Sequence, residues 1–125
     1  MTYKVVIPGR LPSLNEYLSA CASHPQKGAR MKRENEDLCI VYIRKYMRGI
    51  KIKKPIEIHY RFFEKNTKRD RGNIGSMADK VFEDALQKAQ VITSDDWHHV
   101  VGIYYDEFSV DNKIPRIEIE IVEVE

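Results

Sequence analysis

Three aspartates flank the clearest helical segment of the chain and could together bind a divalent metal ion. Asp70 stands just before this segment, and Asp95 and Asp96 follow it by a few residues. Carboxylate oxygens are the ligands that Mg²⁺ and Mn²⁺ prefer in proteins. A helix of about 16 residues is about 24 Å long, so its two ends share an ion only if the flanking segments fold back toward each other. Spacing alone favours a simpler interpretation, in which Asp70 caps the helix and the acidic pair forms a turn.

Basic side chains surround the first aspartate. Lys65, Lys68, Arg69 and Arg71 all lie within five residues of Asp70. A solvated loop can carry such a cluster without any function. A site that cleaves phosphodiesters, however, needs cations that position the phosphate beside a metal-binding carboxylate.

Lys80 lies about two turns into the same helix, on its polar side. It could stabilise negative charge that develops on a phosphate. It could equally form an ion pair with Asp84, four residues further along the helix. From the spacing alone we favour the ion pair.

Trp97, His98 and His99 follow directly after the acidic pair. Neighbouring residues of a strand point to opposite faces, which argues against a metal site shared by the two imidazoles. For Trp97 we expect a place in the core rather than a role in base stacking.

The segment from Gly9 to Arg30 is rich in Gly, Pro, Ser and Asn, which predicts a loop of roughly twenty residues. Long loops in compact domains are often functional. Its polar and basic residues, with Lys32 just beyond, could contact phosphates or could form an ordinary solvated edge. The sequence gives these two interpretations equal weight.

The charge of the chain is strongly asymmetric although its net charge is only +2. Residues 1–72 contain 17 Lys or Arg and 7 Asp or Glu, whereas residues 73–125 contain 4 and 12. Such asymmetry is a hint of a polyanionic partner. A dipolar surface that keeps the protein soluble is the alternative.

Apolar periodicity predicts an α+β fold in a single domain covering residues 1–125. The order is β–loop–α–β–α–β–β, with two main helices packed on a mixed sheet of about four strands. Asn73 is the expected N-cap of the second helix. The expected strands are 3–7, 55–63, 99–105 and 114–124, and the expected helices are 31–48 and 73–88.

Several classes of protein are disfavoured by the composition. No apolar run approaches the roughly 18 residues of a membrane span, and the start of the chain lacks the apolar core of a signal peptide. Cys21 and Cys39 lack CxxC spacing, and Cys39 falls in a helical apolar stripe, which favours a reduced, buried thiol. We therefore expect a cytoplasmic protein that does not act in a membrane.

Taken together, four stretches of the chain resemble the RusA family of Holliday-junction resolvases, particularly the phage-type members of Gram-positive bacteria. The stretches are IPGRLPSLNEY, YRFFEKNTKRD, NIGSMADKVFEDALQKAQVI and SDDW. The family pattern is a basic run, then D-x-D-N-[IL], a helix with K-x-x-x-D-A-L, and an acidic spot just beyond it. The resemblance covers nearly the whole chain.

The resemblance implies a homodimeric endonuclease that depends on Mg²⁺, with Mn²⁺ able to substitute. Such an enzyme binds branched DNA, namely four-way junctions, and nicks two opposing strands. By position, Asp70 matches the first motif aspartate, Lys80 the helix lysine, and Asp95 or Asp96 the third acid. These four are the implied catalytic residues, and the three aspartates are the implied metal ligands. The implied DNA-binding residues are Arg10, Asn15, Lys27, Arg30, Lys32, Lys68, Arg69, Arg71 and Asn73.

The chain departs from the family pattern at Gly72, where the second motif aspartate is expected. In an extended D-x-D segment the two carboxylates project to the same side and can share a metal ion. Glycine supplies no such ligand, so metal binding and cleavage should be weakened unless Asp96 or Asp79 compensates. The main alternative is therefore a junction-binding protein with weak or no catalysis. A third is an α+β protein whose charge asymmetry serves a protein partner.

Overall fold

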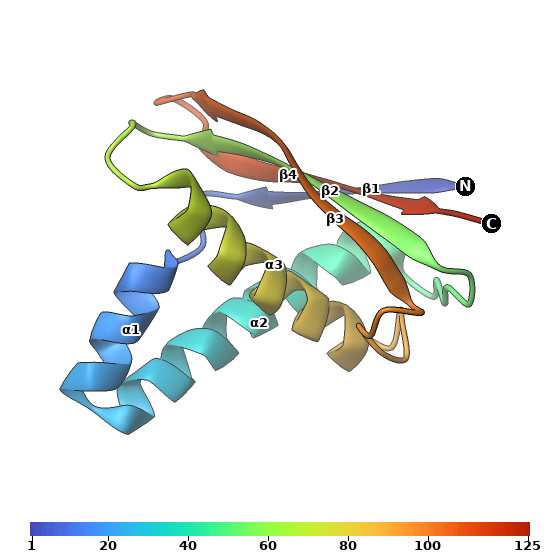
Figure 1. The fold of residues 1–125 in the computed structure, drawn as a ribbon, viewed down its shortest axis with the longest axis horizontal. Helices are drawn as coiled ribbons and strands as arrows, with labels where there is room; N and C mark the ends of the chain where they lie inside the picture. Colours follow the sequence, from blue (N-terminus) through green and yellow to red (C-terminus); the bar gives the residue numbers. More distant parts are fainter.

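The computed structural model describes all 125 residues and confirms the predicted α+β class. A four-stranded mixed sheet has the strand order β1-β4-β2-β3, and three helices lie on one of its faces (Figure 1). β2 pairs with β3 in parallel, whereas β4 is antiparallel to both β1 and β2. The strands are β1 (Thr2–Pro8), β2 (Ile56–Glu64), β3 (Val100–Val110) and β4 (Arg116–Glu123).

The strands form because their apolar residues alternate with polar ones. In β2 every second residue from Ile56 to Glu64 is buried, and β4 buries Ile117, Ile119 and Ile121. With a period of two, one face of the sheet packs against the helices and the other faces solvent. The pairings of β4 with β1 and with β2 run without a register shift, and β4 ends at Glu123.

The predicted loop over residues 9–30 is wrong, because most of it is helical. Helix α1 covers Leu14–Ser23, and α2 covers Pro25–Met47. Ser13 and Glu16 form a reciprocal capping box at the start of α1, and Pro25 occupies the first turn of α2. The turn-forming residues that predict a loop are thus the caps that start two helices.

Helix α3 covers Arg71–Lys88 and presents a continuous apolar face to the sheet. It begins two residues earlier than predicted, so Asp70 and not Asn73 holds the N-cap position. The Asp70 side chain, however, makes no capping hydrogen bond. The helix ends where Gln90 adopts a positive φ of 62°.

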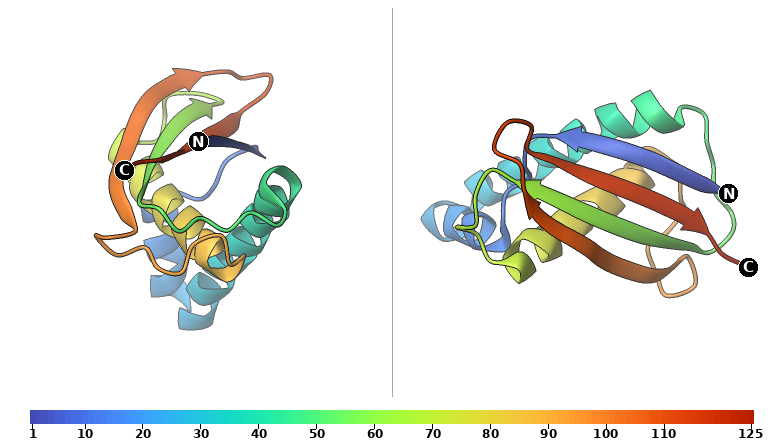
Figure 2. Two further views of the ribbon diagram at one scale, coloured as in Figure 1. Left: turned by 90° about the vertical axis from the view of Figure 1, so that its right-hand side faces the viewer. Right: turned by 90° about the horizontal axis from the view of Figure 1, so that it is seen from above.

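Strand β3 lies at one edge of the sheet and pairs with β2 alone. It starts one residue later and ends five residues later than predicted, and its register against β2 shifts at two points. Seen from above in Figure 2, it runs along the border of the sheet with no strand beyond it. Because β2 and β3 are parallel neighbours, the end of β2 and the start of β3 lie at opposite ends of the strand pair.

The two cysteines and the apolar character of the helices were also the subject of predictions. Cys39 is fully buried as predicted and both cysteines are free thiols, and burial raises the pKa of Cys39 to about 12. None of the three helices combines the length and the apolar character that crossing a membrane requires.

Candidate metal and nucleic-acid site

Asp70 lies in a hollow of about 410 Å³ that is lined only by polar and charged residues. The connection between β2 and α3 forms one side of it, and the start of α1 forms the other. Because α1 begins at Leu14, the polar residues around its first turn face the β2–α3 connection. The hollow brings together six predicted site residues, namely Arg10, Asn15, Lys68, Arg69, Asp70 and Asn73.

The Asp70 carboxylate is free to take a ligand. Its side chain is exposed, accepts no capping hydrogen bond and has no ion-pair partner. It also borders a second hollow, of about 370 Å³, which the end of β3 lines with Phe108, Ser109 and Val110. The first aspartate therefore lies beside the terminal residues of the edge strand.

Arg69 holds this region together rather than projecting from it. Its guanidinium donates two hydrogen bonds of 2.9 Å to the Glu64 carboxylate and further bonds of 2.8 Å to Glu16 and to the Leu11 carbonyl. Burial opposes its charge, but the hydrogen bonds with Glu64 and Glu16 raise the pKa of Arg69 above its ordinary value. With nearly all its donors used, Arg69 has little capacity for a phosphate, and we assign it a positioning role.

The other predicted DNA contacts divide into free and engaged cations. Lys32 contacts Asp84 at 3.0 Å and Glu36 at 3.7 Å, and Arg10 lies 3.8 Å from Glu64. The free cations, which are exposed and form no ion pair, are Lys27, Arg30, Lys68 and Arg71. Lys68 lines the polar hollow, Arg71 lines the hollow beside the end of β3, and Lys27 and Arg30 line a third hollow along the start of α2. These four cations are available to an external anion.

The second acidic spot consists of Asp95 and Asp96, whose carboxylates differ in their hydrogen bonds. Asp96 Oδ1 accepts hydrogen bonds from the backbone of His98 and His99 and lies 2.6 Å from the His99 ring. Above all the contact with His99 lowers the pKa of Asp96 to about 2. Asp95 is exposed and makes no hydrogen bond or ion pair. Asp96 therefore stabilises the turn before β3, and Asp95 is the carboxylate open to a ligand.

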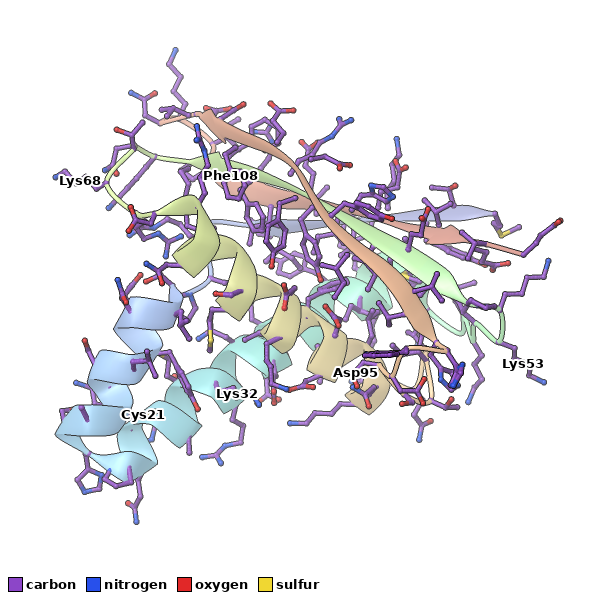
Figure 3. The ribbon with its side chains drawn as sticks, viewed as in Figure 1. Cys21, Lys32, Lys53, Lys68, Asp95 and Phe108 are labelled. Carbon is purple, nitrogen blue, oxygen red and sulfur yellow. The ribbon has the colours of Figure 1, made fainter.

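A single chain does not bring Asp70 together with Asp95 and Asp96. Helix α3 has 18 residues and is about 27 Å long, with Asp70 at the N-cap just before its first residue. Figure 3 shows Asp95 toward the other end of α3 and Lys68 beyond its start. Accordingly, no group of three or more potential metal-binding residues occurs in the chain. The predicted metal site with three aspartates stays a prediction that requires more than one chain.

Gly72 lies in the first turn of α3, so the segment is not the extended D-x-D arrangement that the sequence suggests. A side chain at this position would meet no atom within 4 Å. The position could therefore carry an aspartate close to Asp70 without steric conflict. Asp79, the other predicted substitute, lies nine residues after Asp70 and accepts a hydrogen bond from the Tyr105 hydroxyl. It therefore supplies no carboxylate ligand beside Asp70.

Two favoured structural roles are wrong. Lys80 forms no ion pair with Asp84, which is engaged by Lys32 instead, so the Lys80 side chain is exposed and free. Trp97 is not in the core, because 92% of its surface is exposed. His99 belongs to the turn before β3, where Asp96 and Thr93 contact its two ring nitrogens.

Sequence reasoning missed a buried carboxyl group in α3. Glu83 is only 6% exposed and lies 3.5 Å from the Tyr60 hydroxyl. Burial, followed by the charges of Asp79 and Asp95, raises the pKa of Glu83 to about 8. The available signal was weak: Glu83 adjoins the apolar positions Val81 and Phe82, and nothing in the sequence indicates which tyrosines face it.

No known protein-family model matches the chain, and no curated protein matches its sequence.

Proposed function

We propose that the protein is a metal-dependent endodeoxyribonuclease that acts on branched DNA, as the resemblance to the RusA resolvases implies. The observation that carries the proposal is the polar hollow around Asp70. Residues from two distant parts of the chain, 10–16 and 65–73, meet there around one free carboxylate, with unpaired cations at its rim. A free carboxylate beside free cations suits a divalent ion and a phosphodiester.

A second copy of the chain would complete the site. Asp70 adjoins Val110 at the end of β3, and the carbonyl of Asp96 bonds to Val100 at its start. Antiparallel pairing of two β3 edges around a two-fold axis places the end of one strand beside the start of the other. This arrangement brings Asp70 of one chain near Asp95 of the partner subunit, and it generates two equivalent sites.

The exposed residues on and around β3 support such pairing. Ile103 and Tyr104 are each 43% exposed in the middle of the strand, and Trp97 and Val110 are exposed near its two ends. Edge strands that must stay unpaired usually carry lysine or proline, and β3 contains neither. Around a two-fold axis at the strand centre, Trp97 of one chain would lie toward the exposed Ile114 of the other.

In this arrangement Asp70 and Asp95 would hold Mg²⁺ or Mn²⁺, whose Lewis acidity lowers the pKa of bound water and favours attack on phosphorus. Lys68 and Arg71 would hold the DNA backbone beside the carboxylates. Lys80, exposed and without a partner, would stabilise developing negative charge on the phosphate.

Cleavage of four-way junctions in Mg²⁺ or Mn²⁺ tests the assignment when the unaltered protein is compared with Gly72→Asp. We expect the aspartate to raise the cleavage rate about tenfold or more, because it adds an anionic ligand two residues after Asp70. Gly72→Asn is the matched control, similar in size but uncharged. If Gly72→Asp folds normally and cleaves no junction with either metal, the site is wrongly assigned.

The alternative is a junction-binding protein without catalysis, and Gly72 is the observation that favours it. It predicts tight, salt-sensitive binding of branched DNA and no nicking at any metal concentration. A gel-shift comparison of four-way and linear DNA separates both proposals from a protein-binding role, which predicts no preference for branched DNA.

A further inference from the structure

A second basic surface lies at the far end of α2, away from the polar hollow. It consists of Arg44, Lys45, Arg48, Lys51, Lys53 and Lys54. All six side chains are exposed, and none forms an ion pair. The sequence between Asp37 and Glu57 contains no acidic residue that could neutralise them. The surface is therefore a strongly uncompensated concentration of positive charge.

The lysines of this surface project from an anchored segment. Gly49, with a φ of 76°, ends α2, and the following Ile50 and Ile52 turn toward the core. The Ile52 amide donates a 2.8 Å hydrogen bond to the Val91 carbonyl at the end of α3. Because the half-buried Ile50 and the buried Ile52 alternate with Lys51 and Lys53, these cations are held outward before any partner binds. Such preorganisation lowers the entropy lost on binding.

The surface also has a shape that can receive a ligand. A hollow of about 680 Å³ lies between the end of α2 and the turn that follows α3. Cationic side chains form one side of it, and Ala89, Gln90 and Val91 form the other. The cationic side chains that line it are Arg44, Lys45, Arg48 and Lys51.

The helix dipole explains only part of this cluster. Cations in the last turn of a helix interact favourably with its C-terminal carbonyls, and Arg44 and Lys45 lie in the last turn of α2. Lys51, Lys53 and Lys54 lie beyond the helix and make no such contact. The negative charge that would neutralise these three lysines must therefore come from a partner outside the chain.

The position of the surface relates it to the second acidic spot. The Ile56 amide, two residues after Lys54, donates a 2.9 Å hydrogen bond to the His99 carbonyl. The basic segment thus adjoins the turn that carries Asp95, Asp96 and the exposed Trp97. Figure 3 shows Lys53 and Lys68 at opposite ends of the molecule, so each end of α3 has its own carboxylates and its own free cations.

We propose that the second basic surface binds the sugar-phosphate backbone of a double-stranded DNA arm next to the second acidic spot. This inference rests on the proposed function, because DNA is taken as the substrate. Lys27 and Arg44 are separated by about 26 Å along α2, the length of roughly eight base pairs. The free cations at the two ends of α2 can thus contact separate segments or arms of the DNA. Interfaces with DNA are also far more positively charged than interfaces with proteins.

The test is DNA binding in the presence of a chelator, which removes cleavage from the measurement. The variant Arg44→Gln/Arg48→Gln/Lys51→Gln is compared with the control Lys4→Gln/Arg61→Gln/Lys113→Gln, which loses the same charge from exposed positions elsewhere. We expect the first variant to bind junction and duplex DNA about tenfold or more weaker than the control. The slope of log affinity against log salt should fall by roughly 2–3, one unit for each lost phosphate contact.

Lys53→Gln/Lys54→Gln provides a second variant at positions that carry no packing, and circular dichroism verifies that each variant is folded. Equal affinities of the patch variants and the control, with the unaltered protein binding DNA, would overturn this inference alone. Absence of DNA binding by the unaltered protein would overturn both this inference and the proposed function.

Discussion

Glu83 is a carboxylic acid whose surroundings oppose its own ionisation. Its carboxyl lies almost fully buried beneath the sheet, with one long contact to Tyr60 and with Asp79 and Asp95 nearby. Burial without a cation raises its pKa from 4.5 to about 8. The folded protein therefore retains a proton on Glu83 at pH values where the unfolded chain has lost it.

This retained proton makes stability depend on pH. From about pH 4.5 to 8 the folded state binds more protons than the unfolded state, so the free energy of unfolding falls as pH rises. We expect Glu83→Gln to remove this dependence and to be more stable at pH 8.5 by a few kcal/mol. Urea unfolding at pH 6 and pH 8.5 measures the effect.

Glu34→Gln, at an exposed position of α2, is the matched control and should leave the pH dependence unchanged. A Glu83→Gln protein that loses stability between pH 6 and 8.5 as steeply as the unaltered protein would contradict the assignment of this proton to Glu83.

Arg69 and Lys68 illustrate what residue identity alone does not reveal. Both are basic neighbours of Asp70, and the sequence assigns both to DNA. In the folded chain Arg69 is bound to Glu64, Glu16 and Leu11, whereas Lys68 is exposed without a partner. The difference arises from contacts with residues up to 58 positions away, which no local pattern contains.

Two glycines of α3 show how an element depends on its neighbours. Gly72 lies in the first turn with open space around it, whereas a side chain at Gly75 would meet the Tyr105 ring at 2.5 Å. Gly75 thus permits close packing of α3 on β3. Gly72 has no such role and only lowers helix propensity.

We expect opposite effects from the two matched alanine substitutions. Gly72→Ala should stabilise the protein by about 0.5–1 kcal/mol, because alanine favours the helix. Gly75→Ala should destabilise it by about 1–3 kcal/mol, because the ring of Tyr105 must move. Urea unfolding of both variants gives the comparison, and a Gly75→Ala protein as stable as Gly72→Ala would show that Tyr105 does not pack against α3.

The segment over residues 9–30 shows why elements can be predicted wrongly from composition. Ser13, His24 and Pro25 are typical of loops, yet each occupies a position at the start of a helix. Turn residues and caps are the same residue types, since both bond to local backbone groups. The error mattered for the site, because α1 is what places Asn15 opposite Asp70.

At the scale of the whole molecule, the free edge of β3 is the surface that pairing of two chains would use. Ile103→Lys introduces a charge in the middle of this edge, where it opposes strand pairing. We expect the variant to be folded but monomeric, and to have lost metal-dependent cleavage if the proposed two-chain site is correct. Light scattering after size exclusion measures the mass.

Val41→Lys is the control, since Val41 is 61% exposed on α2, away from the β3 edge. It should leave the mass unchanged. If the unaltered protein is monomeric at all concentrations, or if Ile103→Lys remains a dimer, association through β3 is wrong.

The sequence by itself determined the fold class, the strands and the apolar face of α3, because these follow from local periodicity in hydrophobic residues. It also placed Asp70, Lys68 and Asn73 in one neighbourhood, since they lie within a few residues of each other. The prediction that Gly72 replaces a motif carboxylate rests on the order of residues and on the resemblance to the RusA family alone.

The tertiary structure alone decided which of these groups are available and where they meet. Lys32 and Arg69 became internal partners of acids from other elements, whereas Asp95 was left free and Asp96 was used by a turn. Parallel pairing of β2 with β3 put Asp70 and Asp95 at opposite ends of α3. Strand direction and side-chain partners are set by contacts between distant residues, which is why local patterns cannot supply them.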